Sequence, residues 1–322
     1  MKNTILQVRD LSIVYDTPFG MIHATAGVTF DVKRGESISL VGESGSGKST
    51  VGLAIAMALP PNARIVNGSI LYGDVDLLRL GEDERRRYSG REISAVFQDP
   101  LATLNPLFTI GEQMTDVLMS NLGLSKEEAF KRAKEFLKKV GLTDPERILR
   151  SFPHELSGGM LQRVNIAIAT STEPKILVAD EPTTMLDVIS QAQILELFEE
   201  LKRDLDLALL FITHNLGVAS KIADRIIVMY AGTIVEDGPV DYILSKPLHP
   251  YTVGLLDCVP RIHVKEKRLK SIPGFPPDLS RPINGCPFAD RCNEASDVCR
   301  KTKPELIEVV PGRRVACFKY KR

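Results

Sequence analysis

Apolar and polar residues alternate over residues 5–16 and again over residues 22–33, where Val28, Phe30 and Val32 share one face. A period of two is typical of half-buried strands, so these segments predict antiparallel strands that open the chain. Seven later segments also predict strands, several of them short continuous apolar runs of the kind found in buried strands. They are residues 37–41, 68–73, 93–97, 176–181, 207–213, 225–230 and 233–236.

Between these runs the period changes to that of a helix. Helices are predicted at 51–59, at a charged turn over 82–87, within 109–150, from about 156 to 170, and over 190–203. In the segment 109–150, Phe130, Ala133, Leu137 and Val140 fall on one helical face, with lysines elsewhere. Strands alternating with helices indicate an α/β fold. The simplest interpretation of 109–150 is a helical insert in that fold.

Composition places the chain among soluble globular proteins. It has 322 residues, of which 43% are hydrophobic and 25% charged, which suits one large domain or two of ordinary size. No apolar run reaches the ~18 residues that a membrane helix needs. The first ten residues contain no hydrophobic signal core, so we expect a protein that is not exported and lies in the cytosol.

The chain changes character near residue 250, where we place a domain boundary. Residues 250–322 contain nine prolines, all five cysteines, and 15 Lys/Arg against 8 Asp/Glu. The tail therefore carries a surplus of seven positive charges in a chain whose net charge is zero. Such a surface suits acidic protein, anionic lipid or nucleic acid, or is simply a solvated basic tail.

The strongest chemical motif is a glycine-rich loop between the strand at 37–41 and the helix at 51–59. It fits G-x-x-x-x-G-K-[ST] and comprises Gly42, Glu43, Ser44, Gly45, Ser46, Gly47, Lys48, Ser49 and Thr50. Glycines let successive backbone N–H groups point inward, and the following helix adds its free N-terminal donors and positive dipole end. Lys48 can then reach the β- and γ-phosphates of a nucleotide, and the Ser49 hydroxyl can ligate Mg²⁺.

A pair of carboxylates, Asp180 and Glu181, ends the apolar strand at 176–181. By itself such a pair is more often a helix cap. Beside a phosphate loop, however, the Asp can hold the Mg²⁺ shell and the Glu can polarise the water that attacks the γ-phosphate.

The order of the motifs resembles the nucleotide-binding subunits of ABC transporters over residues 1–250. The motifs that carry this resemblance are the phosphate loop, Gln98, Leu156-Ser-Gly-Gly159, Asp180-Glu181, Leu186-Asp187 and His214. The segments Phe152–Arg163, Asp180–Thr184 and His249–Thr252 look more narrowly like ATPase subunits of dipeptide, oligopeptide and nickel importers. Met185, in the Asp187 loop, is bulkier than is usual there.

The resemblance implies a fold and a set of roles. The fold would be a P-loop NTPase core with an antiparallel β subdomain, a helical subdomain at about 100–165 and a small Cys-containing C-terminal domain over 251–322. Tyr15 would stack on adenine, although a strand aromatic is often only core. Gln98 would ligate Mg²⁺ and water and sense a membrane subunit. Asp180 would bind Mg²⁺, Glu181 would be the general base, and His214 would lie near the γ-phosphate.

The resemblance also assigns Ser157, Gly158 and Gly159 to a nucleotide held by a second ATPase. In this family two ATPase domains meet head to tail, and the helix N-terminus of one contacts the ATP of the other. Asp187 would join the two sites across that interface.

Four cysteines, Cys286, Cys292, Cys299 and Cys317, lie within 32 residues of the tail. In a cytosolic protein such clustering favours metal over disulfides. Their spacing fits neither zinc pairs nor ferredoxin runs. Because tails of this importer family are similar to cluster-bearing examples, a [4Fe–4S] cluster is favoured over zinc or free thiols. Cys258 stays outside as a buried apolar thiol.

The resulting expectation is an ATP-hydrolysing subunit of a bacterial ABC importer of di- and oligopeptides, with nickel or oligosaccharide as alternative cargo. Its partners would be two membrane permeases, a second ATPase and an extracytoplasmic binding protein, and its place the cytoplasmic face of the membrane. A soluble ABC ATPase acting on nucleic acid is disfavoured. The chain has one ATPase unit, no long coiled-coil insertion, and no aromatic-and-basic interleaving in its tail.

Overall fold

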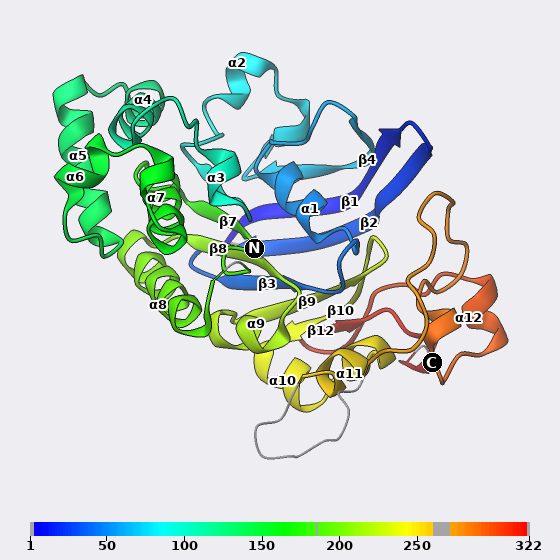
Figure 1. Ribbon diagram of the computed structural model, residues 1–322. Coiled ribbons are helices and arrows are strands. Elements are labelled where there is room, and N and C mark those ends of the chain that lie inside the picture. The colour runs from blue at the N-terminus through cyan, green and yellow to red at the C-terminus, as the bar shows by residue number, and fades with distance from the viewer. Residues whose placement is uncertain (1–2, 185, 260–270, 321–322) are drawn as a thin grey trace.

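The structure, a computed structural model, describes residues 3–184, 186–259 and 271–320, so Met185 lies outside the described residues. Two sheets form its centre, with helices packed on and beside them (Figure 1). Within the described residues, no helix is both long and apolar enough to cross a membrane.

The larger sheet carries the site and has eight strands. In spatial order they are β11 (Ile307–Val310), β12 (Arg313–Val315), β10 (Thr233–Pro239), β9 (Arg225–Tyr230), β3 (Ser37–Val41), β8 (Ala208–Thr213), β7 (Ile176–Asp180) and β6 (Ile93–Val96). The five strands from β9 to β6 run parallel. Their carboxyl ends therefore meet at one edge, where ligands bind in open α/β sheets.

The smaller sheet is antiparallel and lies over the first. Its order is β2 (Gly20–Lys33), β1 (Thr4–Thr17), β4 (Ala63–Tyr72) and β5 (Val75–Asp76). The two long opening strands confirm the alternation in the sequence, since Val28, Phe30 and Val32 are all fully buried.

Helices connect the strands and surround the two sheets (Figure 1). They are α1 (Lys48–Ile55), α2 (Glu82–Arg85), α3 (Pro100–Thr103), α4 (Ile110–Leu122), α5 (Lys126–Lys139), α6 (Pro145–Arg150), α7 (Gly158–Thr170), α8 (Val188–Leu205), α9 (Leu216–Ile222), α10 (Val240–Ser245), α11 (Pro250–Asp257) and α12 (Asp297–Lys301). Single 3₁₀ turns lie at Leu77–Arg79, Pro153–Glu155, Ala289–Arg291 and Phe318–Tyr320.

Helices α4 to α7 gather around a common core, which confirms that residues 109–150 are helical. Both α4 and α5 begin with a capping box, Thr109 with Glu112 and Ser125 with Glu128. Of the four apolar residues on the predicted helical face, Ala133, Leu137 and Val140 are buried. Phe130, at the edge of that face, is 41% exposed, and Phe136 joins the core instead.

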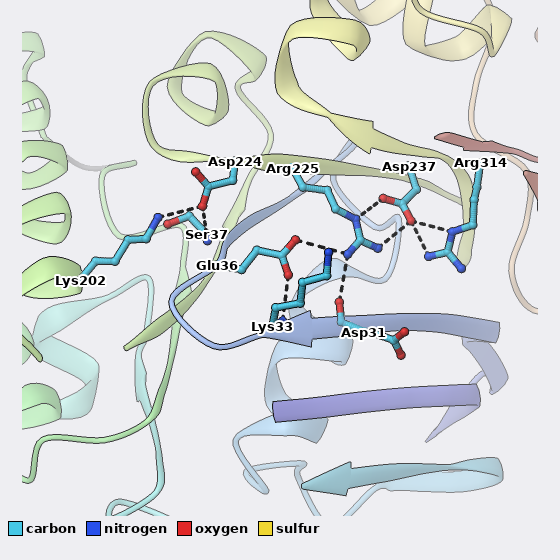
Figure 2. A network of polar contacts seen from close by, with 9 residues as sticks. All are labelled: Asp31, Lys33, Glu36, Ser37, Lys202, Asp224, Arg225, Asp237 and Arg314. Carbon is cyan, nitrogen blue, oxygen red and sulfur yellow. Dashed lines mark hydrogen bonds and ion pairs between the residues drawn. The ribbon is translucent and has the colours of Figure 1, made fainter. Parts of the chain in front are cut away.

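The tail adds strands to the large sheet, with β12 paired to β10 and β11 paired to β12. The buried Asp237 of β10 anchors this edge: it accepts hydrogen bonds from Arg225 at 2.6 and 2.8 Å and from Arg314 of β12 at 2.9 Å (Figure 2). Because part of the tail completes the main sheet, a separate small Cys-containing domain is not confirmed.

Candidate functional site

The phosphate loop connects the buried strand β3 to helix α1, and two of its glycines are required by geometry. A Cβ on Gly42 would lie 2.1 Å from the carbonyl oxygen of Met229. Gly47 has φ +94°, and a Cβ there would lie 2.3 Å from the carbonyl oxygen of Ala24. The backbone curls so closely in front of α1 that neither position has room for a side chain, and only glycine fits.

Lys48 is buried and its ammonium group turns back into the loop. It donates hydrogen bonds to the carbonyl oxygens of Gly42 at 2.9 Å and Glu43 at 2.8 Å, and to the Ser46 hydroxyl at 3.2 Å. Burial lowers the pKa of Lys48, while the carboxylates of Glu181 and Asp180 oppose that shift. The cation therefore lies inside the loop, and its contact with nucleotide phosphates stays a prediction.

Ser49 and Asp180 are 131 positions apart in sequence and meet in space. The Ser49 hydroxyl donates a 3.1 Å hydrogen bond to Oδ1 of Asp180 at the end of β7. Burial raises the pKa of Asp180, and the hydrogen bond from Ser49 opposes that rise. A hydroxyl and a carboxylate are the hard oxygen donors that Mg²⁺ prefers, so this pair fits the ion.

Glu181 follows Asp180 with φ +46°, in the left-handed region that a non-glycine residue rarely adopts. A backbone hydrogen bond from its N–H to Ile212 holds this conformation at 2.9 Å. Its two carboxylate oxygens lie 3.2 Å from Nδ1 of His214 and 2.8 Å from the hydroxyl of Thr184, which donates to it. The carboxylate is thus held in place beside an imidazole that is half exposed. Thr184 was assigned no role from the sequence. The only feature of the sequence that could have indicated this contact is its position three residues after Glu181.

Tyr15 and Gln98 lie near the same region. The Tyr15 hydroxyl donates to Oγ1 of Thr50, in the first turn of α1, at 3.2 Å. Gln98 is exposed just beyond β6, the strand paired with β7. The adenine-stacking role of Tyr15 and the Mg²⁺ and water role of Gln98 stay predictions.

Ser157, Gly158 and Gly159 begin α7 and face open space. Ser157 is the N-cap, and no neighbouring atom lies within 4 Å of where a Cβ on either glycine would sit. Across residues 3–184, 186–259 and 271–320, no hydrogen bond or ion pair joins these three to the phosphate loop. They are free to contact another molecule.

Asp187 caps α8 and is also at the surface. It accepts hydrogen bonds from the Ser190 hydroxyl at 2.6 Å and from the N–H groups of Ser190 and Ile189 at 3.0 and 2.9 Å, and these bonds lower its pKa, the hydroxyl bond most. The next two residues are large and apolar, yet Val188 is 81% and Ile189 72% exposed. This is an apolar patch of the kind that a partner covers.

The four clustered cysteines line one cavity of about 340 Å³, together with His249 and Phe288. Burial raises the pKa of Cys286 to about 11 and raises those of Cys292 and Cys317. In the described part of the chain, no three His, Cys, Asp or Glu side chains are placed to hold one metal ion. The iron–sulfur prediction is therefore unsupported and stays a prediction. Cys258 is half-buried rather than fully buried.

Comparison with known proteins decides the family. Residues 25–184 match the model of the family described as ABC transporter, and residues 235–299 match the oligopeptide/dipeptide transporter C-terminal region. The oligopeptide transport ATP-binding protein OppD of Bacillus subtilis is 47% identical over 95% of this chain and 86% of its own length. OppD of Salmonella typhimurium is 44% identical over 98% of this chain and 94% of its own. The chain belongs to the ATP-binding subunits of oligopeptide/dipeptide ABC transporters.

Solved structures agree with this family. A dimeric bacterial ABC transporter cassette, MJ0796, has a TM-score of 0.66 and 31% identity, and the match covers 73% of this chain and 98% of that one. The same cassette in a post-hydrolysis state with ADP and Pi gives a TM-score of 0.65. The ABC ATPase fold expected from the motifs is therefore confirmed, and this subunit is an ATP hydrolase of the ABC transport class.

Proposed function

We propose that this subunit binds Mg·ATP at Gly42–Thr50 and hydrolyses it in a head-to-tail pair of ATPase subunits, driving the uptake of short peptides through two membrane permeases. It would sit at the cytoplasmic face of the membrane and never touch the peptide, which an extracytoplasmic binding protein would deliver. The partner ATPase is a second copy or a homologous subunit.

The observation that carries this proposal is that the chain brings together one half of an ATP site and holds the other half apart from it. The phosphate loop, Asp180, Glu181 and His214 converge through Ser49–Asp180 and Glu181–His214 hydrogen bonds. The helix N-terminus at Ser157–Gly159 faces open space instead. One chain therefore offers the nucleotide and metal side of a site, and also the donor group that a partner's site needs.

Exposed apolar side chains are consistent with contacts to both proposed partners, the second ATPase and the permeases. Val188 and Ile189 directly follow Asp187, where the second ATPase would meet this one. Leu101, Leu107 and Phe108 are 55%, 80% and 47% exposed just after Gln98, where a permease helix would dock.

Glu181→Gln tests the hydrolytic part of the proposal. The amide can hold its place but cannot accept a proton from the attacking water. The variant should bind ATP, retain it in a stable ATPase dimer and lose hydrolysis. Glu196→Gln, the same change at an exposed site on α8, is the matched control and should hydrolyse ATP normally. Sustained hydrolysis by Glu181→Gln would rule out Glu181 as the base.

The cargo is tested by uptake. Cells with the intact transporter should accumulate labelled di- and tetrapeptides, and Glu181→Gln should abolish that uptake. Nickel or oligosaccharide uptake that is lost in the same variant, with peptide uptake unchanged, would replace the peptide assignment.

We also propose that Cys286, Cys292, Cys299 and Cys317 hold a [4Fe–4S] cluster. The support for this proposal is that all four thiols line one cavity of about 340 Å³. Buried thiols with raised pKa values stay protonated unless a metal offsets their charge. When bound, the cluster would crosslink the tail.

The colour of the purified protein tests this cofactor. Anaerobically purified protein should be brown and contain iron and acid-labile sulfide, both lost in Cys292→Ser and retained in Cys258→Ser. Colourless protein with stoichiometric zinc, or with no metal, would refute the cluster.

A further inference from the structure

Glu43, inside the phosphate loop, is held through all of its polar groups. Its backbone N–H donates to the Tyr251 hydroxyl at 2.8 Å, and its carbonyl oxygen accepts from Lys48 at 2.8 Å. Its carboxylate accepts two hydrogen bonds from Arg291, at 2.6 Å on Oε2 and 3.0 Å on Oε1. The residue beside Lys48 is therefore paired with an arginine 248 positions away, in the tail.

Arg291 is built into this position. Its side chain is only 5% exposed. Besides the two bonds to Glu43, it donates to the Tyr230 hydroxyl at 3.1 Å and to the carbonyl oxygens of Pro273 at 2.9 Å and Ile272 at 3.2 Å. These five bonds match the five donors of a guanidinium group. The planar fork fixes the orientation of the carboxylate that it holds.

The pair matters because of what the loop must bind. Glu43 places a negative charge next to Gly42, in a loop that receives the negatively charged phosphates. An unpaired carboxylate there would repel the nucleotide and would compete with the phosphates for Lys48. Paired with Arg291, its charge is offset and its side chain is drawn toward the tail.

We propose that Arg291 is a positioning residue of the ATP site, which neutralises Glu43 so that the phosphate loop can accept Mg·ATP. This inference rests on the proposed function, since it assumes that the loop binds ATP. It gives the tail a role in nucleotide binding: Arg291 directly precedes Cys292, so one turn of chain serves both the cysteine cavity and the ATP site.

The test is a double-mutant cycle on the full-length chain. The measured quantity is the Kd for Mg·ATP, obtained by titration with a fluorescent ATP analogue. Arg291→Gln should raise Kd about tenfold, equivalent to ~1.4 kcal/mol, because Glu43 is left unpaired. Glu43→Gln should change Kd by less than about threefold. The double variant Glu43→Gln/Arg291→Gln should return to within about threefold of wild type, because the repelling charge is gone.

The control is Arg300→Gln, which removes an arginine from the same part of the tail. Arg300 pairs with the exposed Asp290 at 2.5 Å, so its loss should leave Kd unchanged. Two further quantities are measured for every variant: the thermal unfolding temperature in the absence of nucleotide, and the metal content of the purified protein. These two measurements identify any loss of ATP affinity that follows only from damage to the tail.

Three outcomes would overturn the proposal. A folded Arg291→Gln with wild-type Kd would show that Arg291 does not act on the site. Failure of the double variant to recover would show that the effect is not one of charge. If Arg291→Gln does not fold, Arg291→Lys and the double variant decide: each should bind ATP within about threefold of wild type, and a tenfold loss in either refutes charge pairing. A wild-type chain that binds no ATP would instead refute the proposed function itself.

Discussion

Ser49 of the phosphate loop donates a 3.1 Å hydrogen bond to Asp180, the last residue of β7. This contact joins the strand–loop–helix unit at β3 and α1 to a strand on the other side of β8. It brings a hydroxyl and a carboxylate together at the carboxyl edge of the sheet, where Lys48 and Glu181 also lie. The first prediction concerns this pair.

Asp180→Asn should weaken Mg-dependent ATP binding, because the amide keeps its shape but loses the charge that attracts the ion. An interaction with a charged group contributes about 1.5–3 kcal/mol, so the Kd for Mg·ATP should rise about tenfold or more. Isothermal titration calorimetry with ATP, in the presence and absence of Mg²⁺, measures the Kd of the wild type and of the variant. The two proteins should differ far less without Mg²⁺; an equal loss in both conditions would mean that Asp180 does not act through the metal.

His214→Ala should lower kcat while leaving the Kd for ATP nearly unchanged. Nδ1 of His214 lies 3.2 Å from Glu181 and so orients the predicted general base. Positioned acid–base groups contribute about 10²–10⁴-fold to rate, which sets the scale of the expected loss. Steady-state hydrolysis and nucleotide titration together separate the two effects. Thr184→Val, which removes the other contact of Glu181, should cost less because it removes a neutral hydrogen bond.

His249 should make the protein less stable in mild acid. It is 1% exposed, its Nδ1 caps α11 by accepting from the N–H of Tyr251, and burial lowers its pKa from 6.5 to about 3. The unfolded chain therefore takes up this proton near pH 6.5, whereas the folded chain does not until about pH 3. The stabilisation is fully present above pH 6.5 and is lost as pH falls toward 3, by at most ~1.4 kcal/mol per pH unit.

His249→Asn isolates this contribution, because asparagine can still cap the helix but does not titrate. Urea unfolding at pH 7 and pH 5 should show wild type losing up to ~2 kcal/mol more than the variant over that interval. Parallel pH profiles for the two proteins would assign the acid sensitivity to other groups.

Asp237→Ala should strongly destabilise the fold, because it leaves Arg225 and Arg314 without the carboxylate between them (Figure 2). Removing one partner of a buried ion pair costs about 3–5 kcal/mol. Asp290→Ala breaks an exposed pair with Arg300 and should cost less than about 1 kcal/mol. The free energy of unfolding from urea titration measures both. Equal small losses would mean that β12 is not held to β10 through Asp237.

Local sequence patterns predicted most of the elements. Alternation in the two opening strands, the apolar run of β8 and the helical pattern of α7 each depend on neighbours within a few residues. The phosphate loop was recognisable for the same reason: its chemistry requires Gly42 and Gly47 at a fixed spacing, between a strand and a helix. The pattern placed Phe130 on the same face as Ala133 and Leu137 but left the width of the buried stripe undetermined, and Phe130 lies at its exposed edge.

The amino-acid sequence by itself determined the ATPase core, the family that it resembles and the residues predicted to bind the nucleotide, because these depend on short motifs with strict local geometry. Only the tertiary structure decided which distant side chains meet. It paired Glu181 with His214, completed the main sheet with β12 and placed Arg291 on Glu43. Contacts between residues so far apart depend on how whole elements pack together. No local pattern in the chain encodes such packing.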